Sequence, residues 1–311
     1  MSNKDSLRHN LKIPYYTRIM NWYRNSKIYL PLFNHLIRLI LKIKWIKDKY
    51  IVDQQWTGKE HEVTEWYKNK TIFFGFSSIR SGTVFLANIL TSETKNSHIE
   101  HEANIIDYWH YPKAIGNEKE AEKYFRNYRF KEIPTRVSAK CNIYGEVNPF
   151  LRLHCKAIKS ILPDAKLFHI IRDGREVVRS VMSREILGNK DPFTKLISPP
   201  INDPYKNNWV QMSRFEKVCW QWQFENHYIR QHVTHFIRFE ELISNYAYFK
   251  NQLLDYLGIN ISIETWQQYV ERPKNITPNY QIGHWENWSD SEREMFKKIC
   301  GNEMEQYGYK L

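Results

Sequence analysis

Cysteine is scarce in this chain, and its spacing excludes two kinds of structural framework. The 311 residues include four cysteines, at positions 141, 155, 219 and 300, and no two of them have a CxxC spacing. This pattern gives neither a disulfide framework nor a zinc site. A chain of this length can bury a core without cross-links. We therefore expect a reducing compartment and a cytoplasmic protein.

A long uninterrupted apolar run is also missing. The N-terminal sequence MSNKDSLRHN lacks the charged-then-apolar order of a secretory signal, so we predict no signal peptide. The most apolar stretch, residues 27–46, is interrupted by His35, Arg38, Lys42 and Lys44. It falls short of the about 20 apolar residues that span a bilayer, and is a poor candidate for a transmembrane helix.

The same stretch has helical periodicity. Leu36, Leu39, Ile40 and Ile43 recur at intervals of one helical turn, which predicts an amphipathic basic helix.

This helix belongs to a distinct leader. We predict a helical basic extension over residues 1–65 and one α/β domain over residues 66–311. Two interpretations of the extension stay open: its helix packs on the main domain, or it lies at an anionic membrane surface, peripheral to the bilayer.

Negative charge is in deficit. Lysine and arginine number 46 against 34 aspartates and glutamates, a formal net charge of +12. This basic protein suits an anionic partner such as a nucleotide, a nucleic acid, an acidic glycan or a membrane surface. The basic residues are spread along the chain and no nucleic-acid-binding motif is recognisable, so we expect no nucleic-acid partner. A non-catalytic binder of anionic glycans or nucleic acid stays open as an alternative.

Strands and helices alternate from residue 71 onward. The strands are predicted at residues 71–76, 166–171 and 235–239, and the helices at residues 83–90, 150–162, 174–183, 215–232 and 240–258. This alternation predicts an α/β fold with a central parallel β-sheet flanked by helices, as in a single P-loop-type domain. Residues 187–208, rich in Asn, Pro and Lys, look like a long surface excursion.

A loop of small polar residues joins the first predicted strand to its helix. It has the outline of a phosphate-binding loop, but Arg80-Ser81-Gly82-Thr83 stands where a nucleotide-hydrolysing loop has Gly-Lys-Ser/Thr. The N–H groups and dipole of the following helix, the forked charge of Arg80 and the hydroxyls favour a tetrahedral anion. Gly82 lets the backbone approach that anion closely.

A second strand–helix unit offers another anion site. Arg172 stands at the carboxyl end of the second predicted strand, where ligands of open α/β sheets bind, and Ser180 follows about two helical turns later. The two side chains can anchor another phosphate.

Together these two motifs resemble those of sulfotransferases that use 3′-phosphoadenosine-5′-phosphosulfate (PAPS). The resemblance runs from about Ile72 to the C-terminus. It implies that Arg172 and Ser180 bind the 3′-phosphate. It also implies a nucleotide-binding loop that holds the 5′-phosphosulfate and consists of Arg80, Ser81, Gly82, Thr83, Val84 and Phe85.

Two further stretches resemble parts of that family. The sequence QIGHW is similar to the glycine-bearing loop that closes over the 3′-phosphate, which implies roles for Gly283 and His284. The basic residue usual before the glycine is absent here.

The stretch HIEHEANI lies where bacterial and tyrosylprotein sulfotransferases have a catalytic glutamate. Glu102 matches the bacterial His-Glu-Pro form, with Ala103 in place of the proline, and Glu100 matches the tyrosylprotein spacing. As the general base we favour Glu102 over Glu100, with His101 third.

The expected enzyme is thus a PAPS-dependent sulfotransferase. It would move a sulfuryl group in line to a hydroxyl or amine, with a glutamate base and Arg80 against the departing phosphate, and release adenosine 3′,5′-bisphosphate. The basic surface and the aromatic residues favour a carbohydrate or glycolipid acceptor. No metal is expected. A P-loop kinase is the less favoured enzymatic alternative, because a GxxxxGK[ST] loop and an acidic strand end are missing.

Two capped helix starts complete the prediction. Asn148-Pro149 reads as an N-cap followed by proline at the first helical position, which leaves Glu146 free to line an acceptor cleft. Ser289 and Glu292 read as a capping box.

Overall fold

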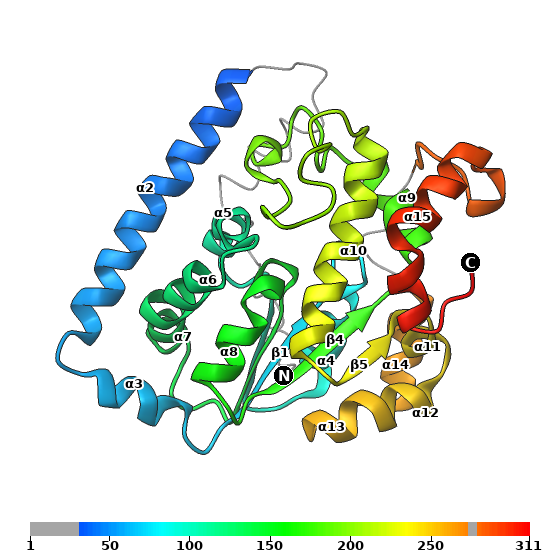
Figure 1. The fold of residues 1–311 in the computed structure, drawn as a ribbon. Coiled ribbons are helices and arrows are strands. Elements are labelled where there is room, and N and C mark those ends of the chain that lie inside the picture. Colours follow the sequence, from blue (N-terminus) through cyan, green and yellow to red (C-terminus); the bar gives the residue numbers. More distant parts are fainter. Residues whose placement is uncertain (1–30, 273–278) are drawn as a thin grey trace, which may run out of the picture.

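A computed structural model describes residues 31–272 and 279–311, and its centre is a five-stranded sheet (Figure 1). The strands are β1 (Thr71–Phe76), β2 (Ser97–His101), β3 (Ile143–Val147), β4 (Lys166–Ile171) and β5 (Phe236–Arg238). Their order is β2-β3-β1-β4-β5, and every neighbouring pair is parallel. All five carboxyl ends therefore meet at one edge of the sheet.

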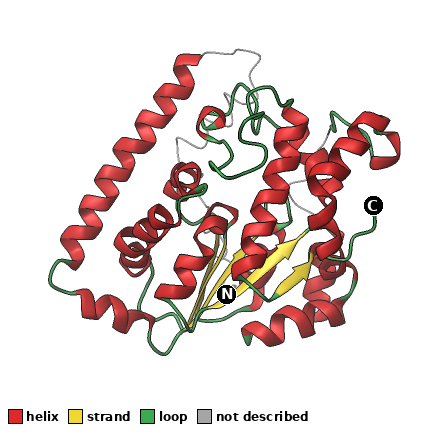
Figure 2. Cartoon of the chain, viewed as in Figure 1, coloured by secondary structure: helices red, strands yellow, loops and turns green. Residues whose placement is uncertain are grey.

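Helices cover both faces of this sheet (Figure 2). They are α2 (Pro31–Trp56), α3 (Glu60–Tyr67), α4 (Thr83–Glu93), α5 (Ile105–Ala114), α6 (Glu118–Tyr124), α7 (Phe130–Arg136), α8 (Cys155–Ile161), α9 (Gly174–Met182), α10 (Arg214–His232), α11 (Phe239–Ser244), α12 (Tyr246–Phe249), α13 (Asp255–Leu257), α14 (Ile263–Glu271) and α15 (Asp290–Gln306). The predicted α/β fold with a central parallel sheet and an N-terminal helix is confirmed.

The alternation of side chains along β1 separates the two layers of the core. Ile72, Phe74 and Phe76 join a cluster with residues of α3, α7 and α8 on one face. Phe73 points to the opposite face and joins a cluster with α4 and α11–α14. Because successive residues of a strand face opposite sides, this strand, apolar after Thr71, is buried on both faces, as expected for the middle of a parallel sheet.

Glycines in the central strands make room for phenylalanines of their neighbours. A Cβ added to Gly145 would lie under 3.0 Å from the ring of Phe73, its partner in register on β1. A Cβ added to Gly75 would collide in the same way with Phe168 of β4. These glycines therefore hold the register of β3, β1 and β4 through packing.

Two strands were not predicted from the sequence. β2 and β3 are short, and each carries a glutamate, Glu100 or Glu146, that obscures the apolar alternation of a strand. Arg136 and Arg129, from a distant helical segment, bond these carboxylates. Sequence spacing does not reveal such partners, which is why neither stretch was predicted to be a strand.

Two predicted helices are interrupted. The helix expected over 150–162 begins as a 3₁₀-helix (Pro149–His154), capped by Asn148 as predicted, before α8 starts. The helix expected over 240–258 is broken at Asn245, whose side chain accepts a hydrogen bond from Tyr248 N and starts α12. A π-helical turn (Lys250–Leu254) then leads to α13.

The expected surface excursion over residues 187–208 is partly buried. Leu187, Phe193 and Ile197 are all less than 5% exposed. The Asp191 carboxylate accepts hydrogen bonds from Phe193 N at 3.0 Å and from the Tyr108 hydroxyl at 3.0 Å. The loop is therefore anchored to α5 as part of the core.

The N-terminal helix α2 packs against the main body along one side. Ile37, Leu41, Val52 and Trp56 are buried, and the Trp45 ring stacks on Tyr128 with centroids 5.6 Å apart. Of the helices described, none is long and apolar enough to cross a membrane. The predicted boundary between residues 65 and 66 lies within α3, and the division into an extension and a domain stays a prediction.

Candidate active site

The site lies at the carboxyl end of β1, where the chain changes direction within the sheet. After β1 the chain runs to β2 and β3 on one side, and from β3 it crosses to β4 on the other side. In open α/β sheets, ligands bind at such a switch point, outside the carboxyl ends of the strands. The loop 77–82 and the start of α4 occupy this place.

The loop backbone is shaped by two left-handed residues. Arg80 has φ 66° and Gly82, the N-cap of α4, has φ 90°. A Cβ at position 82 would also lie under 3.0 Å from the ring of Phe239, so glycine is required here for both conformation and space. Phe85, in the first turn of α4, packs edge-on against the same ring.

The first turn of α4 has no side-chain cap among the described residues. The helices α5, α9, α10 and α15 have such caps, from Asn104, Asp173, Ser213 and Ser289, and the last two form capping boxes, as predicted for Ser289 with Glu292. The N–H groups of Thr83, Val84 and Phe85 therefore point out of the helix start without a side-chain acceptor, which is the arrangement that binds phosphates.

The loop hydroxyls bond within the protein. Ser81 and Ser78 are buried, and their Oγ atoms are 3.0 Å apart. Thr83 Oγ1 lies 2.9 Å from His101 Nε2. Ser77 Oγ is buried and has no hydrogen-bond partner in the described part of the chain. Ser81 thus contributes its backbone to the loop, with its hydroxyl already engaged.

The two predicted anion motifs meet in the structure. Arg80 Nε donates to Ser180 Oγ at 2.9 Å, and Arg172 Nη1 donates to the Arg80 carbonyl oxygen at 2.9 Å. Burial, together with the positive charges of Arg184 and Arg172, lowers the pKa of Arg80 to about 10, so it remains a cation at neutral pH. A bound anion would relieve the repulsion within this cluster.

Residues that follow β5 support Arg172 and its neighbour Asp173, and they stand in no recognisable sequence motif. The Arg172 guanidinium lies 5.2 Å from the centre of the Phe239 ring. Glu240 accepts hydrogen bonds from Asp173 N at 2.9 Å and from the Tyr309 hydroxyl at 2.8 Å. The one available signal was that Phe239 and Glu240 stand at the end of the predicted strand 235–239, because parallel strands end at a common edge.

Strand alternation separates the candidate bases. Along β2, Ile99 and His101 face α4, whereas His98 and Glu100 face the opposite layer. Although burial works the other way, hydrogen bonds from His98 and Arg136 and their charges keep the pKa of Glu100 below its ordinary value. Glu100 is thus a carboxylate held by Arg136, away from the loop.

Glu102 and His101 lie at the loop. Glu102 follows β2 with φ 48°, its side chain is 40% exposed, and Oε1 is 3.6 Å from His101 Nε2. Burial lowers the pKa of His101, an effect that the neighbouring Glu102 opposes, so the imidazole is neutral at pH 7. An exposed carboxylate and a neutral imidazole therefore stand beside Thr83, and each is chemically able to accept a proton.

The loop that contains Gly283 and His284 lies along α9, the helix of Ser180. Gln281 N donates to Ser183 Oγ at 2.8 Å, and His284 Nδ1 is 3.5 Å from Glu176 Oε1. Gly283 accepts from Trp288 Nε1 at 3.0 Å. The structure thus brings this loop next to the predicted 3′-phosphate residues.

The expectation that Glu146 lines an acceptor cleft is wrong. Glu146 is fully buried, where its carboxylate bonds Arg129, the Tyr144 hydroxyl and Asn148. Arg129 is equally buried and pairs with Asp107 at 2.9 Å. The carboxylate neutralises a core guanidinium and has no open face toward a substrate.

A metal site is not apparent in the described ranges. Within residues 31–272 and 279–311, no three His, Cys, Asp or Glu side chains are grouped so that they could hold a metal ion.

Known proteins similar to this chain are sulfotransferases. The sulfotransferase STF9 from Mycobacterium avium has a TM-score of 0.55 at 10% identity, with 96% of this chain and 91% of that one covered. The sulfotransferase domain from the curacin biosynthetic pathway has a TM-score of 0.43 at 13% identity, with coverages of 78% and 99%. At 10% identity, the similarity to STF9 is evidence for a shared fold alone. No curated protein matches the chain in sequence.

A sequence profile described as the sulfotransferase family matches residues 92–262, which is more than half of the 311 residues. The matched range starts at the end of α4 and includes β2, β3, β4 and β5. This chain therefore belongs to the sulfotransferase family.

Proposed function

We propose that this protein transfers a sulfuryl group from PAPS to a hydroxyl acceptor. The observation that carries the proposal is the junction of Arg80, Ser180 and Arg172, which unites two motifs that lie far apart in the sequence. PAPS carries phosphate groups on the 3′ and 5′ sides of one ribose, so a protein that binds it needs two anion-binding sites next to each other. The contacts of Arg80 with Ser180 and Arg172 bring two such candidate sites together.

The fit to the donor rests on the chemistry of the residues present. The uncapped first turn of α4 offers N–H groups to the phosphosulfate, and the Arg80 guanidinium adds positive charge beside it. Arg172 and Ser180 are proposed to hold the 3′-phosphate, with the loop of Gly283 and His284 beside them. Each element supplies donors, which is what an acceptor-rich anionic nucleotide requires.

The proposed reaction is an in-line displacement at sulfur. The acceptor oxygen forms a bond to sulfur while the bond between sulfur and the 5′-phosphate oxygen breaks, and adenosine 3′,5′-bisphosphate leaves. Arg80 and the loop N–H groups stabilise the negative charge that builds on the departing oxygen. The acceptor's proton passes to the Glu102 carboxylate, which stands exposed beside the loop.

Glu102 is proposed as the base on geometry. It is 40% exposed and its partner within reach is His101, whereas Glu100 is held by Arg136 in the opposite layer. His101, neutral and bonded to Thr83, is proposed to position Glu102 relative to α4.

The acceptor class is proposed from surface chemistry alone. A formal charge of +12 and 47 aromatic side chains, from 11 Trp, 20 Tyr and 16 Phe, suit a carbohydrate or a glycolipid with a hydroxyl group. A cytoplasmic location and independence of metal ions belong to the same proposal.

The test is a transfer assay with PAPS labelled in the sulfuryl group and a panel of oligosaccharide and glycolipid acceptors. The proposal expects label in an acceptor, formation of adenosine 3′,5′-bisphosphate in equal amount, and full activity with a metal chelator present. Transfer of the γ-phosphate of ATP to the same panel, with PAPS inert, would show a kinase instead.

A further inference from the structure

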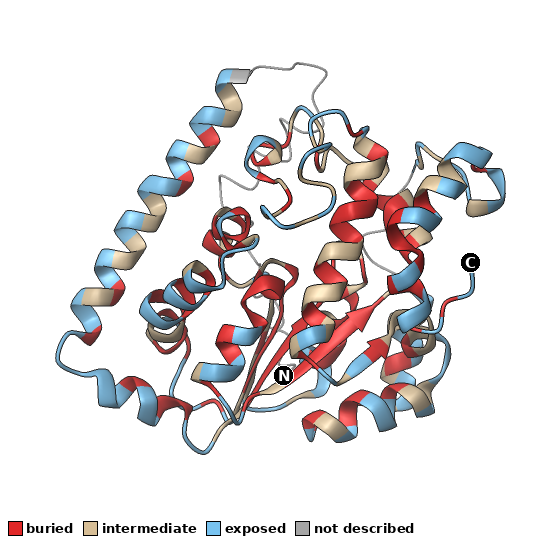
Figure 3. Ribbon diagram, in the orientation of Figure 1, coloured by how far each residue is buried: buried red, intermediate tan, exposed pale blue. Residues whose placement is uncertain are grey.

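The outward side of α2 carries a continuous line of apolar side chains. The outer stripe consists of Leu32, Leu36, Leu39, Ile43, Ile46 and Tyr50, whose side chains are between 48% and 82% exposed. Their spacing alternates between four and three residues, so they lie on one face of the helix. Figure 3 shows exposed residues recurring along α2, from one end of the helix to the other.

The residues of the outer stripe are not part of the buried core. The side of α2 that packs on the main body consists of other residues, Ile37, Leu41, Val52 and Trp56. The helix therefore has two apolar faces, and only one is covered within the described part of the chain. An uncovered apolar face of this length marks an interaction surface.

A second copy of this chain is the first occupant to consider. A four-three spacing of apolar residues is the pattern of a coiled coil, in which the flanking positions of the two helices face each other. Here those flanks are basic: Lys42 on one side of the outer stripe and Lys47 on the other, while Lys49 is paired with Asp53. Pairing two such stripes, in either direction, sets lysine against lysine, which opposes self-association.

The N-terminal segment of the chain has the same sign of charge. Residues 1–30 contain the basic residues Lys4, Arg8, Lys12, Arg18, Arg24 and Lys27, against the single acidic residue Asp5. This segment is therefore as unsuited to the basic flanks of the outer stripe as a second copy is.

An anionic lipid surface is compatible with both the apolar outer stripe and its basic flanks. Leucine, isoleucine and tyrosine side chains insert at the boundary of headgroups and acyl chains, while flanking lysines reach the phosphate groups. The net charge of +12 adds long-range attraction to a negative leaflet. We propose that the outer stripe of α2 docks this protein on an anionic phospholipid membrane, with the helix lying in the plane of the interface.

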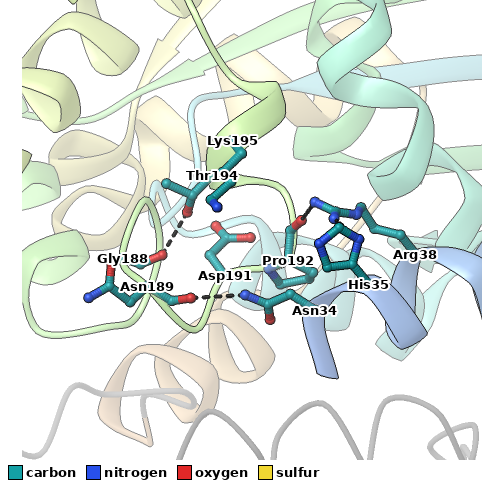
Figure 4. A pocket seen from close by; sticks show the side chains of 9 residues that line it. All are labelled: Asn34, His35, Arg38, Gly188, Asn189, Asp191, Pro192, Thr194 and Lys195. Carbon is teal, nitrogen blue, oxygen red and sulfur yellow. Dashed lines mark hydrogen bonds between the residues drawn. The ribbon is translucent and has the colours of Figure 1, made fainter. Parts of the chain in front are cut away.

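The helix is fixed to the main body firmly enough for docking to orient the enzyme. At its N-terminal half, Asn34 Nδ2 donates to the Asn189 carbonyl at 2.9 Å and Arg38 Nη1 to the Pro192 carbonyl at 3.0 Å (Figure 4). These contacts line a small pocket between α2 and the buried excursion that Asp191 anchors. A membrane bound to α2 therefore holds the whole fold in one orientation.

The experiment is flotation of the full chain with vesicles of phosphatidylcholine, alone or mixed with phosphatidylglycerol. We expect binding to the anionic vesicles only, weakened by salt. Ile43→Glu should reduce that binding at least about tenfold, because it places a charge in the middle of the outer stripe. Lys47→Gln should reduce it about fivefold.

The matched control is Ile263→Glu, since Ile263 is an isoleucine that is 40% exposed on α14, on the other side of the molecule from α2 (Figure 1). It should bind vesicles as the unmodified protein does. Calorimetric binding of adenosine 3′,5′-bisphosphate should be the same for all variants, and it separates this inference from the proposed function, on which it does not rest.

Two results would overturn the inference. One is equal binding of the Ile43→Glu variant and the unmodified protein to anionic vesicles, or no binding by either. The other is a dimer in light scattering that Ile43→Glu converts to a monomer, which would assign the outer stripe to a second copy.

Discussion

Arg80 Nε donates a hydrogen bond to Ser180 Oγ at 2.9 Å, although the two residues are 100 positions apart in the chain. One stands in the loop after β1 and the other in the helix after β4, and these strands are neighbours in the sheet. Parallel pairing thus turns two separate strand–loop–helix units into one basic site. The contact makes the two units energetically dependent on each other.

Removal of the Ser180 hydroxyl should therefore weaken binding of adenosine 3′,5′-bisphosphate. In Ser180→Ala the Arg80 guanidinium loses one partner and the proposed 3′-phosphate loses a donor, so we expect affinity to fall about tenfold to a hundredfold. Calorimetric titration measures this. Ser160→Ala, an exposed serine on α8, is the matched control and should be unchanged; an equal loss in both variants contradicts the assignment.

Gly82→Ala should be destabilising for two separable reasons. The left-handed φ of 90° strains any L residue, and the new methyl group collides with Phe239. The Gly58→Ala variant measures the backbone strain alone, because Gly58 has φ 74° and nothing lies within 4 Å of its added Cβ. We expect Gly58→Ala to reduce the free energy of unfolding by about 1–2 kcal/mol and Gly82→Ala to reduce it by more.

The double variant Gly82→Ala/Phe239→Ala isolates the collision. Urea unfolding should show that the two changes together cost less than the sum of the single changes, because the methyl group occupies space that the ring has left. If the losses of unfolding free energy in the two single variants simply add in the double variant, the Phe239 ring does not collide with the new methyl group.

Buried neutral histidines should make the fold less stable in acid. Burial lowers the pKa of His110 to about 2, of His154 to about 3 and of His169 to about 4. Each binds a proton in the unfolded chain near its usual pKa of about 6.5 but not in the fold. Between pH 6.5 and 4 the unfolded state thus holds more protons, and the free energy of unfolding falls as pH falls.

His169→Gln tests this for one group. It should lower stability at pH 7, because His169 bonds Asn226 and Tyr307 in the core. Between pH 6.5 and 5, however, the unfolding free energy should depend less steeply on pH, because the variant takes up about one proton fewer when it unfolds. An unchanged slope in urea titrations at these pH values would show that His169 is already protonated in the fold.

Glu102→Gln should reduce turnover by about a hundredfold or more, with the affinity for adenosine 3′,5′-bisphosphate retained, because a carboxamide cannot accept the acceptor's proton. Glu100→Gln should keep its turnover and lose stability instead, since Arg136 loses one of its two charged partners and keeps only Glu132. The assay is transfer of labelled sulfuryl groups together with thermal unfolding. Full activity of Glu102→Gln beside an inactive Glu100→Gln would reverse the assignment of the base.

The sequence revealed the elements whose signal is local. β1 and β4 are rich in apolar residues, interrupted only by Thr71, Lys166 and His169, and their predicted bounds match the structure. β2 and β3 were missed because Glu100 and Glu146 are neutralised by Arg136 and Arg129, a pairing that only the fold creates.

The same limit applies to the candidate site. Arg80, Arg172 and Ser180 stand in recognisable motifs, whereas Phe239 and Glu240 support them from a segment without one. In α2 the predicted periodicity marked Leu36, Leu39, Ile40 and Ile43, which form the exposed side of the helix. Apolar spacing shows that a helix has a face, but it does not say which neighbour covers that face.

The most direct test of the proposed function is a calorimetric titration of the protein with adenosine 3′,5′-bisphosphate and, separately, with ATP and Mg²⁺. We expect tight binding of the bisphosphate, weaker binding of ATP, and loss of the bisphosphate signal in Arg80→Ala and Arg172→Ala. We expect no loss in Arg126→Ala, which changes an exposed arginine paired with Glu122. Preference for ATP with Mg²⁺, or bisphosphate binding that survives both site substitutions, would contradict it.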